Sequence, residues 1–235
     1  MTVMRVVPIA WTRIDWQALA TVIGETEFYR QETDNDDPPS DIDLMAEFAG
    51  RGCYLSWDRP NPQTASTETY LGHIQKIVHP NVFEHATVTF YVQDVSRSLL
   101  LELERHRFLS FSVESQRYVD PAKSHGDGPV IPIVMRGTAW EEGLCDAYQV
   151  ALNQYSHAVT ELIRKGHDRK TARGAARALL LESTATSFTL TANIRCWRDV
   201  IGMRLSPAAD AEIREFAAQV LRHLRDLAPF SVQDL

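Results

Sequence analysis

Apolar and polar residues along the chain follow two different periods. Val88, Phe90 and Val92 alternate with two threonines and a tyrosine, and this period of two predicts a half-buried strand. A shorter alternation predicts a second strand at residues 187–191. The Val- and Ile-rich run at residues 4–10 predicts another strand near the start of the chain.

Other segments carry apolar residues at helical spacing. The longest, residues 141–165, places its apolar side chains on one face and is followed by Gly166, a common C-cap. Ser96 can cap a helix that continues into residues 105–107. A helix starting at residue 44 is expected to be interrupted at Gly50 and Gly52. Further helices are predicted at residues 70–78, 193–204 and 208–227.

The pattern also predicts how the chain is organised. Residues 32–43 are acidic and contain Pro38 and Pro39, which predicts a solvated loop. Strands and helices do not alternate regularly as βαβ units, so an α+β fold is expected. The 235 residues allow one large domain or two small ones.

Charge and composition exclude several classes of protein. The formal net charge is −7, so the surface as a whole repels a polyanion, and no nucleic-acid partner is expected. No apolar stretch approaches the length of a membrane span, and the N-terminus lacks the features of a signal peptide, so we expect a cytoplasmic protein without a membrane partner. The cysteines Cys53, Cys145 and Cys196 form no CxxC pair, which argues against a disulfide framework and a zinc site.

Basic residues gather at three places in this acidic chain. The first group combines Arg105, His106, Arg107 and Arg117 with nearby serines. Guanidinium forks match phosphate and carboxylate, so the group suits a phosphorylated small molecule. Groups at residues 164–177 and 195–204 follow. For 164–177 we favour solvated helix faces whose charges are paired with glutamates, because residues 165–170 are typical of a surface turn and only Arg177 lies in an apolar helix segment.

Motifs for other chemistry are missing from the sequence. There is no GxGxxG, GxxxxGK[ST], GxSxG or HExxH pattern, and no cluster of residues suited to a metal.

The segment RHRFLSFSVES, residues 105–115, resembles the RHRx7S signature of the flavin-dependent thymidylate synthases (ThyX). The similarity continues in EFAGRGCYLSW, HPNVFEHATVTFYV, SQRYV, AARALL, NIRCWRDVIGMR and EIR, in the family's order. The resemblance implies one ThyX-like domain over residues 1–235, with an α+β fold, a mixed sheet and assembly as a homotetramer. It also implies reductive methylation of uracil C5 in dUMP or UMP, with FAD as cofactor and with NADPH and 5,10-methylenetetrahydrofolate as co-substrates.

The resemblance also implies roles for individual residues. Arg204 would act in catalysis by stabilising charge on the uracil. Ser115 would contact the phosphate or base without becoming a nucleophile. FAD would be held by Asn81, Arg105, His106, Arg107, Asn193 and Arg195. The nucleotide would be bound by Glu102, Arg105, Ser115, Gln116, Arg117, Arg177 and Arg204.

Three positions depart from the family's usual pattern. Val113 stands in place of Glu or Gln, Leu181 in place of Pro, and Ala208 in place of His. Because Val113 and Ala208 have lost hydrogen-bonding groups, the pocket is expected to admit UMP as well as dUMP. Such an enzyme could be an ordinary thymidylate synthase or a paralogue of polyoxin-type nucleoside antibiotic biosynthesis. The alternative from a different class is a homologue that binds flavin or nucleotide and has lost turnover.

Overall fold

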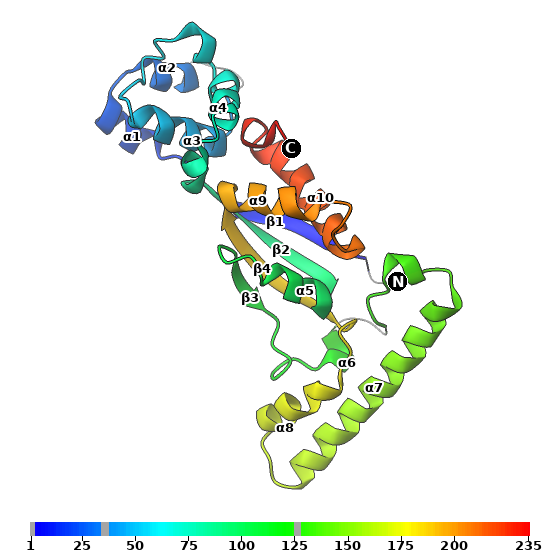
Figure 1. Ribbon diagram of the computed structural model, residues 1–235. Coiled ribbons are helices and arrows are strands. Elements are labelled where there is room, and N and C mark those ends of the chain that lie inside the picture. The colour runs from blue at the N-terminus through cyan, green and yellow to red at the C-terminus, as the bar shows by residue number, and fades with distance from the viewer. Residues whose placement is uncertain (1–2, 34–37, 125–127) are drawn as a thin grey trace. The chain divides into compact units, whose positions relative to one another are not determined.

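A computed structural model of the chain describes residues 3–33, 38–124 and 128–235. Figure 1 shows helices combined with one small sheet, which confirms the expected α+β class. The strands are β1 (Arg5–Trp11), β2 (Thr87–Ser96), β3 (Ser110–Val113) and β4 (Ala185–Asn193), in the order β1-β2-β4-β3. The α-helices are α1 (Trp16–Ile23), α2 (Glu27–Thr33), α3 (Asp41–Gly52), α4 (Thr67–Lys76), α5 (Arg97–Leu103), α6 (Pro121–Ser124), α7 (Ala139–Arg164), α8 (Arg169–Ala176), α9 (Ile194–Arg204) and α10 (Ala211–Leu227).

The sheet is antiparallel where we expected a mixed one. Thr12 N–H donates to Thr87 O, so the end of β1 meets the start of β2. Arg97 N–H donates to Thr184 O, which joins the end of β2 to the start of β4. The strands therefore pair with opposite directions. Within β2, Val88, Phe90 and Val92 are fully buried as their alternation predicted.

The chain divides into two compact units. The first unit comprises Met1–Val7, Phe90–Leu190 and Ala209–Phe216. The second unit comprises Pro8–Thr89, Thr191–Ala208 and Ala217–Leu235.

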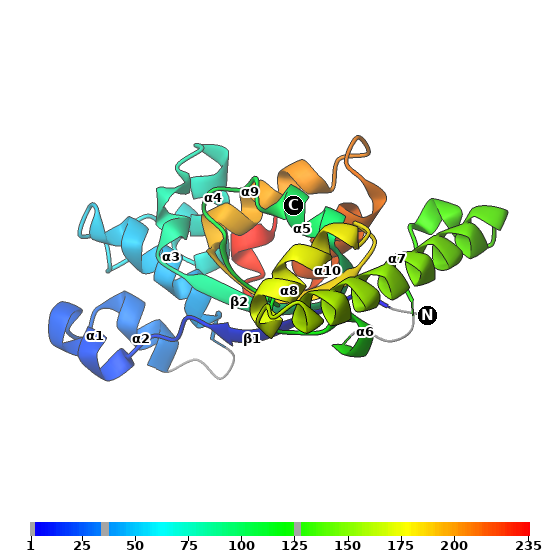
Figure 2. The same cartoon turned by 90° about the horizontal axis from the view of Figure 1, so that it is seen from below.

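In the first unit, α8 packs along the long helix α7, as both views show (Figures 1 and 2). The predicted helix at residues 141–165 is thus confirmed, and Gly166 follows it with φ of +95°. Only Tyr148 and Tyr155 of α7 are buried, whereas Trp140, Val150 and Ile163 are exposed. The apolar face of this helix is therefore only partly covered by its own chain.

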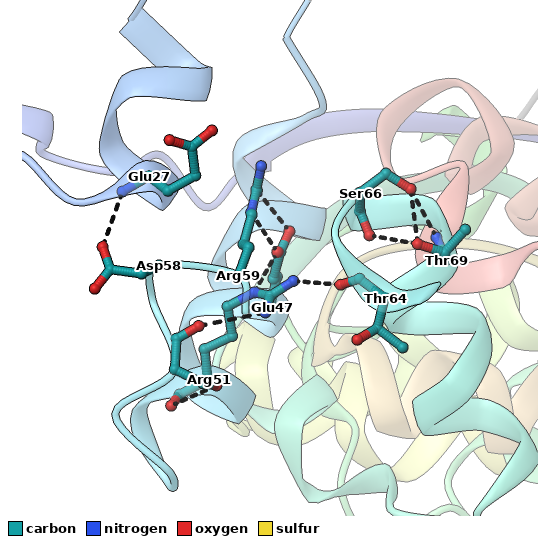
Figure 3. Close-up of polar contacts among 9 residues, drawn as sticks. Glu27, Glu47, Arg51, Asp58, Arg59, Thr64, Ser66 and Thr69 are labelled. Atoms are coloured by element: carbon teal, nitrogen blue, oxygen red, sulfur yellow. Dashed lines mark hydrogen bonds and ion pairs between the residues drawn. The ribbon is translucent and has the colours of Figure 1, made fainter. Parts of the chain in front are cut away.

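The second unit contains a buried ionic network, drawn in Figure 3. The carboxylate of Glu47 on α3 accepts from Arg51 Nε at 2.5 Å and from Arg59 at 3.1 and 3.2 Å. Arg51 also donates to Thr64 O at 2.7 Å and lies 4.4 Å from the ring of Tyr70. Since Glu47, Arg51 and Arg59 are almost inaccessible, the network ties α3 to the segment that connects it with α4.

The acidic segment before α3 is only partly the loop that we predicted. Residues 34–37 lie outside the described part of the chain. Helix α2 continues to Thr33, and α3 begins at Asp41, where Ser40 accepts from Asp43 N–H as N-cap. The prediction was wrong for residues 41–43 because this serine provides the helix start that the acidic composition concealed.

Asp43 is buried by the C-terminal segment of the chain. Its carboxylate accepts from Ser231 N–H at 2.8 Å, from Ser231 Oγ at 2.5 Å and from Phe230 N–H at 3.2 Å. Burial raises the pKa of Asp43, and the hydrogen bonds with Ser231 and Phe230 oppose this only in part. The folded chain therefore binds a proton at Asp43 more tightly than the unfolded chain does.

This raised pKa predicts a pH dependence of stability. Protonation of Asp43 favours the folded state, so its contribution is complete below the unfolded pKa, near 3.8, and is lost as the pH rises through the folded pKa. The stability of the wild type relative to Asp43→Asn is expected to increase as the pH falls from 7, by at most about 1.4 kcal/mol per pH unit. Urea unfolding of both proteins at several pH values measures this difference. A difference that is constant or that shrinks towards acid pH would contradict the prediction.

Candidate functional site

The RHR sequence follows a short helix of the first unit. Ser96 accepts from Leu99 N–H, so it is the N-cap of α5 as predicted. The helix ends at Leu103, so the prediction that it continues into residues 105–107 was wrong. Arg105 and Arg107 lie just beyond this end and are exposed, while His106 is half-buried. Neither arginine has an ion pair within the described residues. Both guanidiniums are therefore available to an anion.

Ser115 lies in a turn after β3. Its Oγ accepts from Arg117 N–H at 3.4 Å, and its carbonyl accepts from Tyr118 N–H and Val119 N–H. This contact with Arg117 is the only hydrogen bond of the Ser115 hydroxyl in the part of the chain that the structure describes. The hydroxyl proton remains free to be donated, and no base contacts the oxygen within those residues, which suits a binding group better than a nucleophile.

Helix α8 packs against this turn. Arg173 donates to Tyr118 O and forms an ion pair with Asp120 at 3.2 Å. Gly174 lies beneath Arg117, because a Cβ built at this glycine would be 3.7 Å from Arg117 Nε. The contacts hold Arg117 against the helix.

Arg177 directly follows α8 as its C-cap. The structure thus brings the Ser115–Arg117 turn beside the helix that ends at Arg177. Arg117 and Arg177 are both exposed, and neither has an ion pair among the described residues.

The basic residues at 164–177 therefore differ in their surroundings. Arg164 and Lys165 pair with Glu161, in line with our interpretation of solvated, paired charges. The surface turn predicted at residues 165–170 is confirmed for residues 165–168 and wrong for Arg169 and Lys170, which begin α8. Its buried face consists of Ala172 and Ala176, so the helix packs through alanines, which give only a weak apolar pattern. The spacing of these two alanines was the available signal.

Two of the predicted FAD segments come together in the second unit. Arg195 forms an ion pair with Glu84, and Ile194 N–H donates to Ala86 O at 3.0 Å. Glu84 ends the 3₁₀ helix Pro80–Glu84, which also contains the exposed Asn81. Residues 81 and 193–195 are therefore neighbours through this helix, although 112 positions separate Asn81 from Asn193 in the chain.

The side chains of these segments are partly engaged. Asn193 is the N-cap of α9, and its oxygen accepts from Cys196 N–H at 2.8 Å, which leaves the amide group as the donor. Arg195 would have to share its guanidinium between Glu84 and a ligand. Arg204 is the last residue of α9 and is half-buried.

Each unit offers donors that suit the pyrophosphate of FAD. In the first unit, Arg105 and Arg107 have guanidiniums without an ion pair among the described residues. In the second unit, Asn193 has an amide donor. Such donors suit an anionic group that carries several oxygen acceptors. The described residues contain no group of His, Cys, Asp and Glu placed to hold a metal ion.

Cys196 is unsuited to nucleophilic chemistry. It is buried, and burial raises the pKa of its thiol to about 11. The thiol therefore stays protonated near neutral pH, where only a thiolate would react.

A cavity of about 670 Å³ lies within the first unit. Of the predicted site residues it contains Glu102, and none of the arginines assigned to FAD or nucleotide lines it. Its charged lining is mainly acidic, so it is unsuited to a phosphate. The charged lining residues are Asp94, Glu102, Arg136, Glu182, Asp210, Glu212, Arg214 and Glu215.

Comparison with known proteins identifies the family of this chain. Residues 37–230 match the model of the Thy1 family, described as thymidylate synthase complementing protein. The chain belongs to the flavin-dependent thymidylate synthase family. Within the described residues, no helix is both long and apolar enough to cross a membrane.

Relatives in this family align over nearly the whole chain. A probable flavin-dependent thymidylate synthase of Mycobacterium phage L5 is 46% identical over 97% of this chain and 95% of its own length. A protein of the same description from Mycobacterium phage D29 is 47% identical over 86% of both chains. The flavin-dependent thymidylate synthase of Mycobacteroides abscessus is 40% identical over 88% of this chain and 86% of its own length.

Proposed function

We propose that the protein is a flavin-dependent thymidylate synthase that methylates C5 of dUMP. In this proposal 5,10-methylenetetrahydrofolate supplies the carbon, NADPH is the reductant, and the protein acts in the cytoplasm. The main support is a pair of exposed arginines, Arg117 in the turn after β3 and Arg177 at the end of α8. Neither forms an ion pair among the described residues, although the net charge of the chain is −7. Family membership supports the same activity.

The phosphate of dUMP is bound by Arg117 and Arg177. Two guanidiniums on adjoining elements can each form paired hydrogen bonds with phosphate oxygens. The Ser115 hydroxyl adds a neutral donor, since its oxygen only accepts from Arg117 N–H. Gln116 and Glu102 complete the nucleotide set that the family resemblance implies.

Arg204 acts at the pyrimidine. When bound, FAD supplies the hydride for reduction of the transferred carbon. The Arg204 guanidinium donates to the uracil oxygens, where it stabilises the negative charge that develops as C5 is activated. Arg105, His106, Arg107, Asn193, Arg195 and Asn81 bind and orient the cofactor.

We also propose that the working form is a homotetramer with FAD bound between subunits. The proposed cofactor residues come from three separate segments, at residues 81, 105–107 and 193–195. Trp140 and Ile163, which flank the side of α7 that carries Tyr148 and Tyr155, are 73 and 44% exposed, and exposed apolar residues of this kind favour contact with another copy.

The tetramer is tested by the mass of the FAD-loaded protein in solution. Light scattering after gel filtration is expected to give four times the mass of the chain, together with flavin absorbance. A monomer that binds flavin and turns over would contradict the assembly. Replacement of Trp140 by Glu should weaken the assembly, whereas the same change at the exposed Tyr54 of the second unit serves as the control.

The substrate range is proposed to include UMP. Val113 is half-buried at the end of β3 and Ala208 is exposed, and neither side chain can form the hydrogen bonds of the family's usual residues. A pocket whose wall has smaller and less polar side chains excludes a ribose 2′-hydroxyl less strongly.

A competition assay tests the activity and the range together. Equal concentrations of UMP and dUMP are incubated with the protein, FAD, NADPH and methylenetetrahydrofolate, and the product masses are read. Methylated forms of both nucleotides are expected. Formation of dTMP alone, with UMP neither reacting nor inhibiting, would contradict the wider range and leave dUMP methylation intact. The absence of any methylated nucleotide would contradict the proposed function, with loss of turnover as the alternative.

A further inference from the structure

Glu212 holds the start of α5 from a distant part of the sequence. One oxygen of its carboxylate accepts from Ser96 N–H at 2.8 Å, and the other accepts from Ser96 Oγ at 2.6 Å. The same Ser96 oxygen accepts from Leu99 N–H at 3.0 Å as the N-cap of α5. Ser96 is only 4% exposed, and Glu212 is half-buried. Both ends of this contact lie in the first unit.

The corner that Glu212 holds is sharp. Strand β2 ends at Ser96 and α5 begins at Arg97, with no loop between them. Asp94, two residues before the corner, has φ of +60°, a conformation that costs free energy for a residue other than glycine. Such a conformation persists only where surrounding contacts impose it. Glu212 binds Ser96, two residues after this position.

The opposite side of the corner is fixed by backbone groups. Arg97 N–H donates to Thr184 O at 3.2 Å, and Ser98 N–H donates to Glu182 O at 3.3 Å. These carbonyls belong to the segment that leads into β4. Without the Glu212 side chain, Arg97 and Ser98 would keep these hydrogen bonds and Ser96 would lose the two that Glu212 accepts.

Small rotations at this corner are amplified at the site. Helix α5 is only seven residues long and leads directly to Arg105. Seven residues at a rise of about 1.5 Å place Leu103, the end of α5, roughly 10 Å from Ser96. A tilt of about 5° would therefore move this end, and the arginine that follows it, by about 1 Å. A misplacement of about 1 Å can cost about 100-fold in an enzyme's rate.

We propose that Glu212 is a positioning residue for the cofactor- and nucleotide-binding groups at the end of α5. The inference rests on the proposed function, because it uses the roles given there to Glu102, Arg105 and Arg107. Glu212 has no direct role in binding. It acts through Ser96, whose position determines the direction of α5.

The test measures binding in place of turnover. Dissociation constants of FAD and of dUMP are measured by titration for the wild type and for Glu212→Ala, together with the thermal midpoint and circular dichroism. Glu212→Ala is expected to weaken binding of both ligands by about 10- to 100-fold at temperatures where it is fully folded. The control Glu215→Ala removes the same charge from the same cavity wall without a contact to Ser96, and it is expected to bind both ligands like the wild type.

Two further variants keep the test decisive if Glu212→Ala does not fold. Glu212→Gln keeps an acceptor for Ser96 N–H and is expected to recover most of the binding. Ser96→Ala removes the hydroxyl that donates to Glu212, and it is expected to weaken binding of both ligands as Glu212→Ala does. A purely structural role for Glu212 would lower the thermal midpoint and leave both dissociation constants unchanged.

The outcomes separate this inference from the proposed function. If the wild type binds both ligands and both Glu212→Ala and Ser96→Ala match it, the positioning role is wrong and the proposed function stands. If the wild type binds neither FAD nor dUMP, both are wrong.

Discussion

Replacement of Arg204 by alanine is expected to slow dUMP methylation by about 100- to 1000-fold while FAD stays bound. The proposed role of Arg204 is to stabilise charge on the uracil, and loss of one preorganised donor costs about 2.7–4 kcal/mol of activation free energy. The cofactor is assigned to other residues, so flavin absorbance should remain with the protein after gel filtration. Turnover is measured as dTMP formed per active site.

Two controls accompany the Arg204 variant. Arg204→Lys keeps the charge and loses the planar fork, so an intermediate rate is expected. Arg222→Ala removes an exposed arginine of α10 that has no proposed role, and its rate should equal that of the wild type. Near-native turnover of Arg204→Ala would show that the residue has been given the wrong role.

Glu47→Ala is expected to have the largest effect on stability, about 3–5 kcal/mol. The substitution leaves Arg51 and Arg59 buried without the carboxylate that both contact (Figure 3). Removing one member of a buried ionic group is costly because the remaining charges keep their desolvation penalty. Urea unfolding measures the loss as a lower midpoint.

The exposed glutamate of α7 provides the matched control for Glu47. Glu161 also contacts two cations, Arg164 and Lys165, but at a solvated surface. Glu161→Ala should therefore leave the unfolding midpoint unchanged. Equal midpoints for the wild type and Glu47→Ala would contradict a stabilising role for the buried network.

The sequence predicted most elements because their signals are local. The alternation around Phe90, the Ser96 cap and the spacing along residues 141–165 all depend on near neighbours in the chain. The resemblance on residues 105–115 also identified the family, which the comparisons confirm. Periodicity showed which face of α7 is apolar, but it carries no information on what covers that face.

Contacts between distant segments could not be predicted in this way. Arg173 was grouped with solvated charges, whereas its ion pair with Asp120 spans 53 positions. Glu47 and Arg51 have the spacing of a helical ion pair, yet nothing local indicates that Arg59 joins them in the interior. The same holds for Glu212 and Ser96, which are 116 positions apart.

The proposed site combines the family pattern with contacts between distant segments. Its residues are assigned by position in a family pattern, and the structure adds the packing of the Ser115–Arg117 turn on α8 and the proximity of residue 81 to residues 193–195. Four of its arginines form no ion pair within the described residues and so are available to bind an anion: Arg105, Arg107, Arg117 and Arg177.

The mass of the nucleotide product with and without flavin tests whether this chain is a flavin-dependent thymidylate synthase. The purified protein is stripped of flavin, divided, and incubated with dUMP, methylenetetrahydrofolate and NADPH, with FAD added to one half only. We expect dTMP in the half that contains FAD and unchanged dUMP in the other. No dTMP in a sample that has bound both FAD and dUMP, or equal dTMP in the two halves, would contradict the assignment of this chain as a flavin-dependent thymidylate synthase.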